Sequence, residues 1–148
     1  MRQRVDGHKF EDEFEKTFKT EGILLRLHTP SAKYSGLTQP ADFIFIANGT
    51  SYVETKETGG DAFSISAMDQ LDEIIKYLHT KHIDCNAKQA VIGSNYYIVV
   101  HFITHKVIKV ITAEYAMELL DSRKRLSYTD MNGHTFKTLE EMKESNIF

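Results

Sequence analysis

The stretch PADFIFIANGTSYVETKETGG, residues 40–60, decides the fold. It contains two segments rich in β-branched, aromatic and other apolar residues, 42–46 and 51–56. Between them stands Asn48-Gly49, a dipeptide that strongly favours a tight turn between antiparallel strands. We therefore predict a β-hairpin here.

The predicted hairpin carries an informative set of charged residues. Asp42 begins the first strand, and Glu54 and Lys56 stand two apart on the second, so strand alternation places the latter two on one face. Carboxylate oxygens are the ligands that Mg²⁺ prefers, and such an ion polarises a phosphate, activates water and stabilises the leaving oxygen. A lysine beside the ion can orient the water, take its proton or neutralise developing charge. The pattern is typical of phosphodiester hydrolysis.

This site requires a particular hairpin register. Directly opposed residues of an antiparallel pair point to the same side, so Asp42 joins Glu54 and Lys56 only if paired residue numbers sum to an even number. A two-residue turn gives an odd sum. We therefore predict a three- or five-residue loop, or a bulge. A three-residue loop over 48–50 would set Asp42 opposite Lys56.

Helices and further strands are expected on both sides of the hairpin. Phe10, Phe14 and Phe18 recur at a spacing of four, which predicts one buried face of a helix capped by Asp6. The other expected elements are a strand over 23–27, a loop over 28–39, a helix from Ser66 to Leu78, strands over 90–92, 96–102 and 107–111, a helix from Thr112 to Leu120, and a short helix from Thr138 with Glu141 in a capping box. This order predicts a single α/β domain, residues 1–148, with a central mixed β-sheet flanked by helices.

Composition and charge exclude several classes of protein. A chain of 148 residues with 41% hydrophobic and 26% charged residues is typical of one globular domain. Its formal charge of -3 excludes DNA binding by bulk positive charge, although a local basic patch remains compatible with it. The single cysteine, Cys85, favours a reducing compartment, and the strongest apolar run, 96–100, is far shorter than the roughly 20 residues that span a bilayer. We expect a cytoplasmic protein without membrane contact.

Four motifs stand in a characteristic order along the chain. They are Gly7-His8-Lys9-Phe10-Glu11 with Phe14, Ala41-Asp42-Phe43, Glu54-Thr55-Lys56-Glu57-Thr58, and Phe63 followed by Ser64 to Gln70. In this order they resemble the RecU-type Holliday junction resolvases of the PD-(D/E)XK nuclease superfamily. The resemblance implies the mixed sheet of that superfamily and a Mg²⁺-dependent, structure-specific DNA endonuclease, with Mn²⁺ as a substitute ion, acting in DNA recombination and repair in a phage or a cell.

The resemblance also implies a role for each matched residue. Lys56 would be the catalytic lysine, supported by Gln70. The expected metal ligands are the carboxylates of Glu11, Asp42 and Glu54 and the carbonyl of Thr55. Arg26 and Thr58 would contact the DNA.

Two basic segments outside the motifs are also expected at the DNA. Lys33 and Tyr34 would form a small basic, aromatic finger within 28–39, a segment much shorter than the insertion that such resolvases project into the branch point. The densest basic run, Arg123-Lys124-Arg125, favours contact with a phosphate backbone. Two symmetric cuts need two active sites, so we expect a homodimer on branched or duplex DNA.

Other interpretations stay open. A flap or restriction-type nuclease of the same superfamily, or a non-catalytic DNA-binding module with this fold, fits the same motifs. The hairpin charges also fit a solvated strand face with a cross-strand pair. His79, His82 and Cys85 have a spacing that suits zinc but lack an obvious fourth ligand. The β-prone stretch 107–111 fits either the core or a dimer interface.

Overall fold

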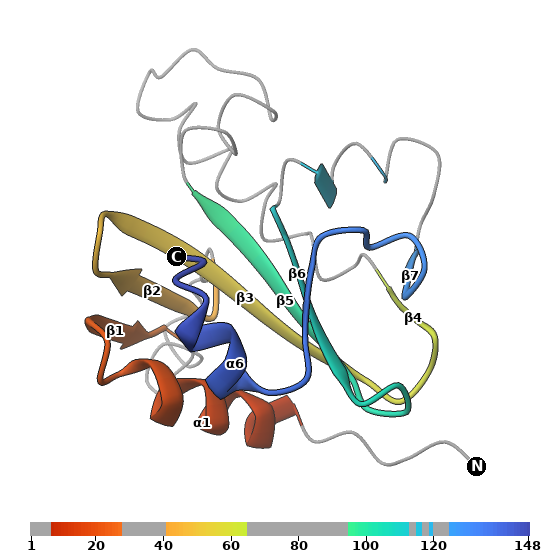
Figure 1. Cartoon of the computed structure of the whole chain (residues 1–148), viewed down its shortest axis with the longest axis horizontal. Coiled ribbons are helices and arrows are strands. Elements are labelled where there is room, and N and C mark those ends of the chain that lie inside the picture. Colours follow the sequence, from red (N-terminus) through yellow and green to blue (C-terminus); the bar gives the residue numbers. More distant parts are fainter. Residues whose placement is uncertain (1–6, 28–40, 65–94, 113–114, 117–118, 120–124) are drawn as a thin grey trace, which may run out of the picture.

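The computed structural model describes residues 7–27, 41–64, 95–112, 115, 116, 119 and 125–148. In chain order these form helix α1 (Gly7–Phe18), strands β1 (Ile23–Arg26), β2 (Phe43–Ile46), β3 (Thr50–Thr58), β4 (Ala62–Ser64), β5 (Tyr96–Phe102), β6 (Val107–Thr112), β7 (Arg125–Ser127) and β8 (His134–Phe136), and helix α6 (Leu139–Glu144) (Figure 1). Several predicted features lie outside the described residues: Lys33, Tyr34, the helix from Ser66 with Gln70, the strand over 90–92, the trio His79, His82 and Cys85, and Arg123 with Lys124.

Six strands form the main sheet, in the order β1-β2-β3-β5-β6-β8. Strands β3 and β5 run parallel, and all other neighbours run antiparallel, so the sheet is mixed. β4 and β7 form a separate two-stranded ribbon beside it (Figure 1). The predicted α/β class with a central mixed sheet is therefore confirmed.

The β2–β3 hairpin has the predicted parity. Phe43 pairs with Val53 and Ile46 with Thr50, so paired numbers have an even sum and the loop has three residues. The predicted loop position is wrong by one residue, because the loop spans 47–49 and leaves Gly49 at its third place with φ of 132°, a conformation that favours glycine. As a result, the register extends to place Asp42 opposite Glu54 rather than opposite Lys56.

Helix α1 covers one face of the sheet with its phenylalanine stripe, as predicted. Phe10, Phe14 and Phe18 are at most 3% exposed. The ring centroids of Phe14 and Phe18 lie 4.6 Å apart, and those of Phe14 and Phe43 lie 4.9 Å apart. Helix α6 packs beside α1 on the same face (Figure 1), where it buries Met142. These contacts hold the helices on the sheet through apolar burial.

The opposite face of the sheet has a second core. Its buried members include Tyr96, Ile98, Val100 and Phe102, all from β5 and spaced by two. Within β6, Ile108 and Val110 face the α1 core while Ile111 joins the second core. The described part of 107–111 therefore belongs to the interior, which is the first of the two interpretations left open for it.

Side-chain caps begin two helical segments as predicted. The Thr138 hydroxyl accepts a hydrogen bond from the Glu141 N–H at 3.1 Å, and α6 follows. The Thr112 hydroxyl accepts in the same way from the Tyr115 N–H at 3.1 Å. Across the ranges given above, none of the helices has the length and apolar character needed to cross a bilayer.

Candidate active site

Asp42 lies just before β2 and is held firmly by β1 and β3. Its N–H donates to the Val53 carbonyl at 3.1 Å, and its own carbonyl accepts from the Leu27 N–H at 2.8 Å. Its carboxylate Oδ2 accepts two bonds from Thr55, from the N–H at 2.8 Å and from the hydroxyl at 2.9 Å. The residue is only 4% exposed. Its position and orientation are therefore fixed by the hairpin itself.

Glu54 and Lys56 share the sheet face opposite α1. The Lys56 ammonium lies 3.2 Å from Glu54 Oε1, and the Glu54 side chain is 3% exposed whereas that of Lys56 is 33% exposed. The carboxylate is thus buried, while the lysine reaches solvent. We call Asp42, Glu54 and Lys56 together the hairpin site.

Tyr96 on the neighbouring strand β5 joins the hairpin site through its hydroxyl. This hydroxyl donates to Glu54 Oε2 at 3.5 Å. Burial, and then the negative charges of Glu54 and Asp42, raise the pKa of the Tyr96 phenol above its ordinary value of 10. The phenol is therefore a protonated donor at neutral pH. The extended hairpin register, with Asp42 opposite Glu54, places both carboxylates at this end of the hairpin.

The sequence predicts a strand over 96–102, but it does not indicate the polar contact of Tyr96. Strand alternation shows which residues of β5 share a face with Tyr96. The alignment of β5 against β3 determines which residue the Tyr96 hydroxyl contacts. Tyr96 pairs with Tyr52 in that parallel register. A parallel register is set by a distant crossover rather than by a local turn, so no local sequence signal could have found it.

Glu11 and Arg26, predicted as a metal ligand and a DNA contact, contact each other. Arg26 Nη2 lies 2.9 Å from Glu11 Oε2, and its Nη1 bonds Asp12. The guanidinium also lies over the Phe43 ring, 5.9 Å from its centroid. Throughout the described ranges, no three His, Cys, Asp or Glu residues are grouped so as to hold a metal ion. Glu11 as a ligand and Arg26 at DNA stay predictions.

The hairpin site itself fits a hard divalent cation. Asp42 and Glu54 supply anionic oxygens, the donor type that Mg²⁺ prefers. Asp42 and Glu54 are nearly buried and stand opposite each other in the hairpin, so their negative charges repel each other, and a cation between them would relieve that repulsion. The Thr55 carbonyl, the remaining predicted ligand, belongs to a residue that already holds Asp42 in place.

Comparison with known proteins gives a match by structure alone. No protein-family model and no curated protein sequence matches the chain. Its structure is similar to that of Hjc, a Holliday junction resolvase from the archaeal hyperthermophile Archaeoglobus fulgidus, with a TM-score of 0.52 and 10% sequence identity. The match covers 92% of this chain and 98% of the other. This chain has the fold of Hjc. This similarity confirms the nuclease-like fold predicted from the sequence. It does not test the predicted resemblance to the RecU type in particular.

Two residues predicted to contact DNA, Thr58 and Arg125, lie near the end of β3. The Thr58 hydroxyl donates to the Ala62 carbonyl and accepts from the Gly60 N–H, both at 3.2 Å, so it is used within the turn. Arg125, at the start of β7, is exposed, and its Nη2 donates to the Ala62 carbonyl at 3.4 Å. The ribbon of β4 and β7 therefore places Arg125 beside this turn. The DNA contacts of both residues stay predictions.

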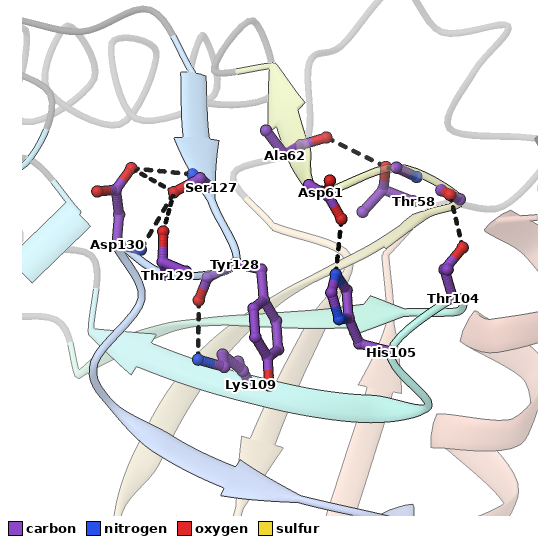
Figure 2. Close-up of polar contacts among 12 residues, drawn as sticks. Thr58, Asp61, Ala62, Thr104, His105, Lys109, Ser127, Tyr128, Thr129 and Asp130 are labelled. Atoms are coloured by element: carbon purple, nitrogen blue, oxygen red, sulfur yellow. Dashed lines mark hydrogen bonds and ion pairs between the residues drawn. The ribbon is translucent and has the colours of Figure 1, made fainter.

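Contacts among three segments hold this end of β3 (Figure 2). The Thr104 hydroxyl donates to the Gly59 carbonyl at 2.8 Å, and His105 Nε2 lies 2.6 Å from Asp61 Oδ1. The His105 ring stacks on Tyr128 with centroids 4.0 Å apart. The β3–β4 turn, the β5–β6 hairpin and the segment after β7 are thus tied together.

Lys109 fastens the segment after β7 to the sheet (Figure 2). Its ammonium donates to the carbonyls of Tyr128 at 2.8 Å and Met131 at 3.2 Å, and it lies 4.0 Å from the centroid of the Tyr128 ring. Lys109 is 7% exposed.

We predict that Lys109→Met lowers the free energy of unfolding by about 1–3 kcal/mol at pH 7, because two carbonyls lose their donor. Denaturant unfolding measures this, with exposed Lys137→Met as the control; equal effects of the two substitutions would contradict a special role for Lys109.

The loss of unfolding free energy caused by Lys109→Met should increase with pH. Burial lowers the pKa of the Lys109 ammonium below its ordinary value of 10.5, so the unfolded chain holds that proton more tightly than the folded chain does. Folding therefore becomes more favourable as the pH rises toward 10.5. The difference in unfolding free energy between the native chain and Lys109→Met is expected to increase from pH 7 to pH 10. A difference that stays flat or shrinks over this range would be the opposite result.

Proposed function

We propose that this protein is a Mg²⁺-dependent, structure-specific DNA endonuclease that resolves Holliday junctions. The observation that carries the proposal is the hairpin site: two buried carboxylates and a solvent-reaching lysine on one side of a sheet with a resolvase fold. The motif order that resembles RecU-type resolvases supports the same conclusion independently.

Each residue of the hairpin site has a chemical task in this proposal. Asp42 and Glu54 would hold Mg²⁺, with Thr55 keeping Asp42 in orientation. When bound, the ion supplies charge stabilisation at the scissile phosphate and at the leaving oxygen. Lys56 would meet the substrate with its one-third exposed side chain, and its ammonium, which lies against Glu54, could orient the attacking water or neutralise developing charge.

The remaining predicted contacts complete this proposal. Glu11 would add a carboxylate after exchanging its bond to Arg26, and Gln70 would support the lysine or the water. Basic residues would contact the phosphate backbone: Arg26, Lys33, Arg123, Lys124 and Arg125, together with Tyr34 and Thr58. Two symmetric cuts need two active sites, so the acting species would be a twofold homodimer on branched DNA.

A panel of DNA substrates tests the proposal. Four-way junctions, flaps and linear duplexes of matched sequence are incubated with the protein and Mg²⁺, Mn²⁺ or EDTA. We expect paired cuts in the junction with either ion and none with EDTA. Preferred cutting of flaps or linear duplex would replace the resolvase by another nuclease of this fold. Tight DNA binding without cutting under any condition would favour a non-catalytic binding module.

A further inference from the structure

We infer that Tyr96 is the positioning residue for Glu54, so that its hydroxyl sets the orientation in which this carboxylate meets the metal ion. The inference rests on the proposed function, because it assigns Glu54 to the ion. It adds to the hairpin site a residue from a different strand, outside all four sequence motifs.

The parallel register of β3 and β5 brings Tyr96 to Glu54. Tyr96 pairs with Tyr52, and Ile98 pairs with Glu54. Tyr96 therefore lies on the same face as Glu54, two residues before the position directly beside it. From there its long side chain reaches Glu54 Oε2 with the hydroxyl. The Tyr52 ring stacks on it with an interplanar angle of 12° and centroids 6.2 Å apart, which restricts the swing of the phenol.

The Glu54 carboxylate is then held from two sides. Lys56 contacts Oε1 at 3.2 Å, and Tyr96 contacts Oε2 at 3.5 Å. With a donor on each oxygen, rotation of the carboxylate about its last bond breaks one of the two contacts. Removing the Tyr96 hydroxyl takes away the donor at Oε2 and leaves the contact of the partly exposed lysine at Oε1.

The burial of Tyr96 favours a positioning role over direct participation in catalysis. Tyr96 is 3% exposed, so it offers almost no surface to a DNA strand. The simpler alternative is a core tyrosine whose hydroxyl merely satisfies its own hydrogen bond. The two roles differ in one measurable quantity: only a positioning role changes the affinity for the ion, while a purely structural role changes stability alone.

Mn²⁺ binding to the whole chain tests the inference. Titration calorimetry compares the native chain with Tyr96→Phe, Tyr97→Phe and Asp42→Asn, below the melting temperature of each. Tyr97→Phe is the matched control, because Tyr97 follows directly on β5 but packs on the opposite face against Phe148. Support of a ligand by its hydrogen-bonded neighbour is typically worth about 10- to 100-fold in metal affinity, so we expect a rise of that size in Kd for Tyr96→Phe. The Kd for Tyr97→Phe should be unchanged.

The outcomes separate this inference from the proposed function. Native Mn²⁺ affinity in Tyr96→Phe, or an equal loss in Tyr97→Phe, overturns the positioning role even if the native chain cleaves DNA. A native chain that binds Mn²⁺ through Asp42 but cleaves no DNA overturns the proposed function, and the comparison of the tyrosine variants still decides the role of Tyr96. A native chain without Mn²⁺ binding overturns both. In the supporting case, higher Mn²⁺ concentrations also restore cleavage by Tyr96→Phe.

Discussion

Replacing Asp42 by Asn, or Lys56 by Ala, is expected to reduce cleavage of a four-way junction by about 100- to 10,000-fold, the range typical for loss of a group that acts in the chemical step. In Asp42→Asn, the amide side chain would keep an oxygen acceptor for the N–H and hydroxyl of Thr55 while losing the negative charge. The variant should therefore remain folded and fail in chemistry alone. Single-turnover cleavage at saturating Mg²⁺ measures the loss.

DNA binding provides the necessary contrast for these two substitutions. Affinity for uncut junction DNA in Ca²⁺ or EDTA is expected to change by no more than a few fold, because Asp42 is buried and Lys56 is one of several basic side chains. Lys137→Ala, at an exposed lysine outside the hairpin site, is the matched control and should cleave at the native rate. Native turnover by both Asp42→Asn and Lys56→Ala would remove the nuclease proposal.

The largest effect on stability is expected from Phe14→Ala. Phe14 is fully buried, and its ring meets those of Phe18, Phe43 and Phe148. Removing it leaves a cavity between α1 and the sheet, which typically costs about 3–5 kcal/mol. Denaturant unfolding should show a loss of this size, seen as a lower midpoint with little change in slope.

The control for Phe14→Ala is an apolar residue outside the core. Ile23 on β1 is 59% exposed, so Ile23→Ala is expected to change the free energy of unfolding by less than about 0.5 kcal/mol. Comparable losses at the two positions would show that the phenylalanine stripe is not the main attachment of α1.

The register of the β2–β3 hairpin and the buried face of α1 could both be predicted from the sequence. The even-sum register of the hairpin follows from a three-residue loop, and it is what puts Asp42 on the side of Glu54 and Lys56. The stripe of Phe10, Phe14 and Phe18 likewise follows from helical periodicity alone. The stripe is contained in one short segment, whereas the loop length follows from the requirement that Asp42 share a side with Glu54 and Lys56, because Asn48-Gly49 alone favours a two-residue turn.

Contacts between distant segments could not be predicted in this way. Tyr96 meets Glu54 only because β5 aligns in parallel with β3, and Lys109 is buried only because the segment after β7 offers it two carbonyls. The exact loop position, 47–49 instead of 48–50, depends on which residue best accepts positive φ. Strands β4, β7 and β8 were not predicted at all, because three-residue strands carry no readable periodicity.

The central claim is that Asp42 and Glu54 together bind a divalent cation. The most direct measurement is anomalous scattering from crystals of the protein grown with Mn²⁺. We predict a single strong anomalous peak in contact with carboxylate oxygens of both residues, and its disappearance in Asp42→Asn. A well-ordered hairpin site without a peak, or a peak bound elsewhere with both carboxylates turned away from it, would contradict the claim.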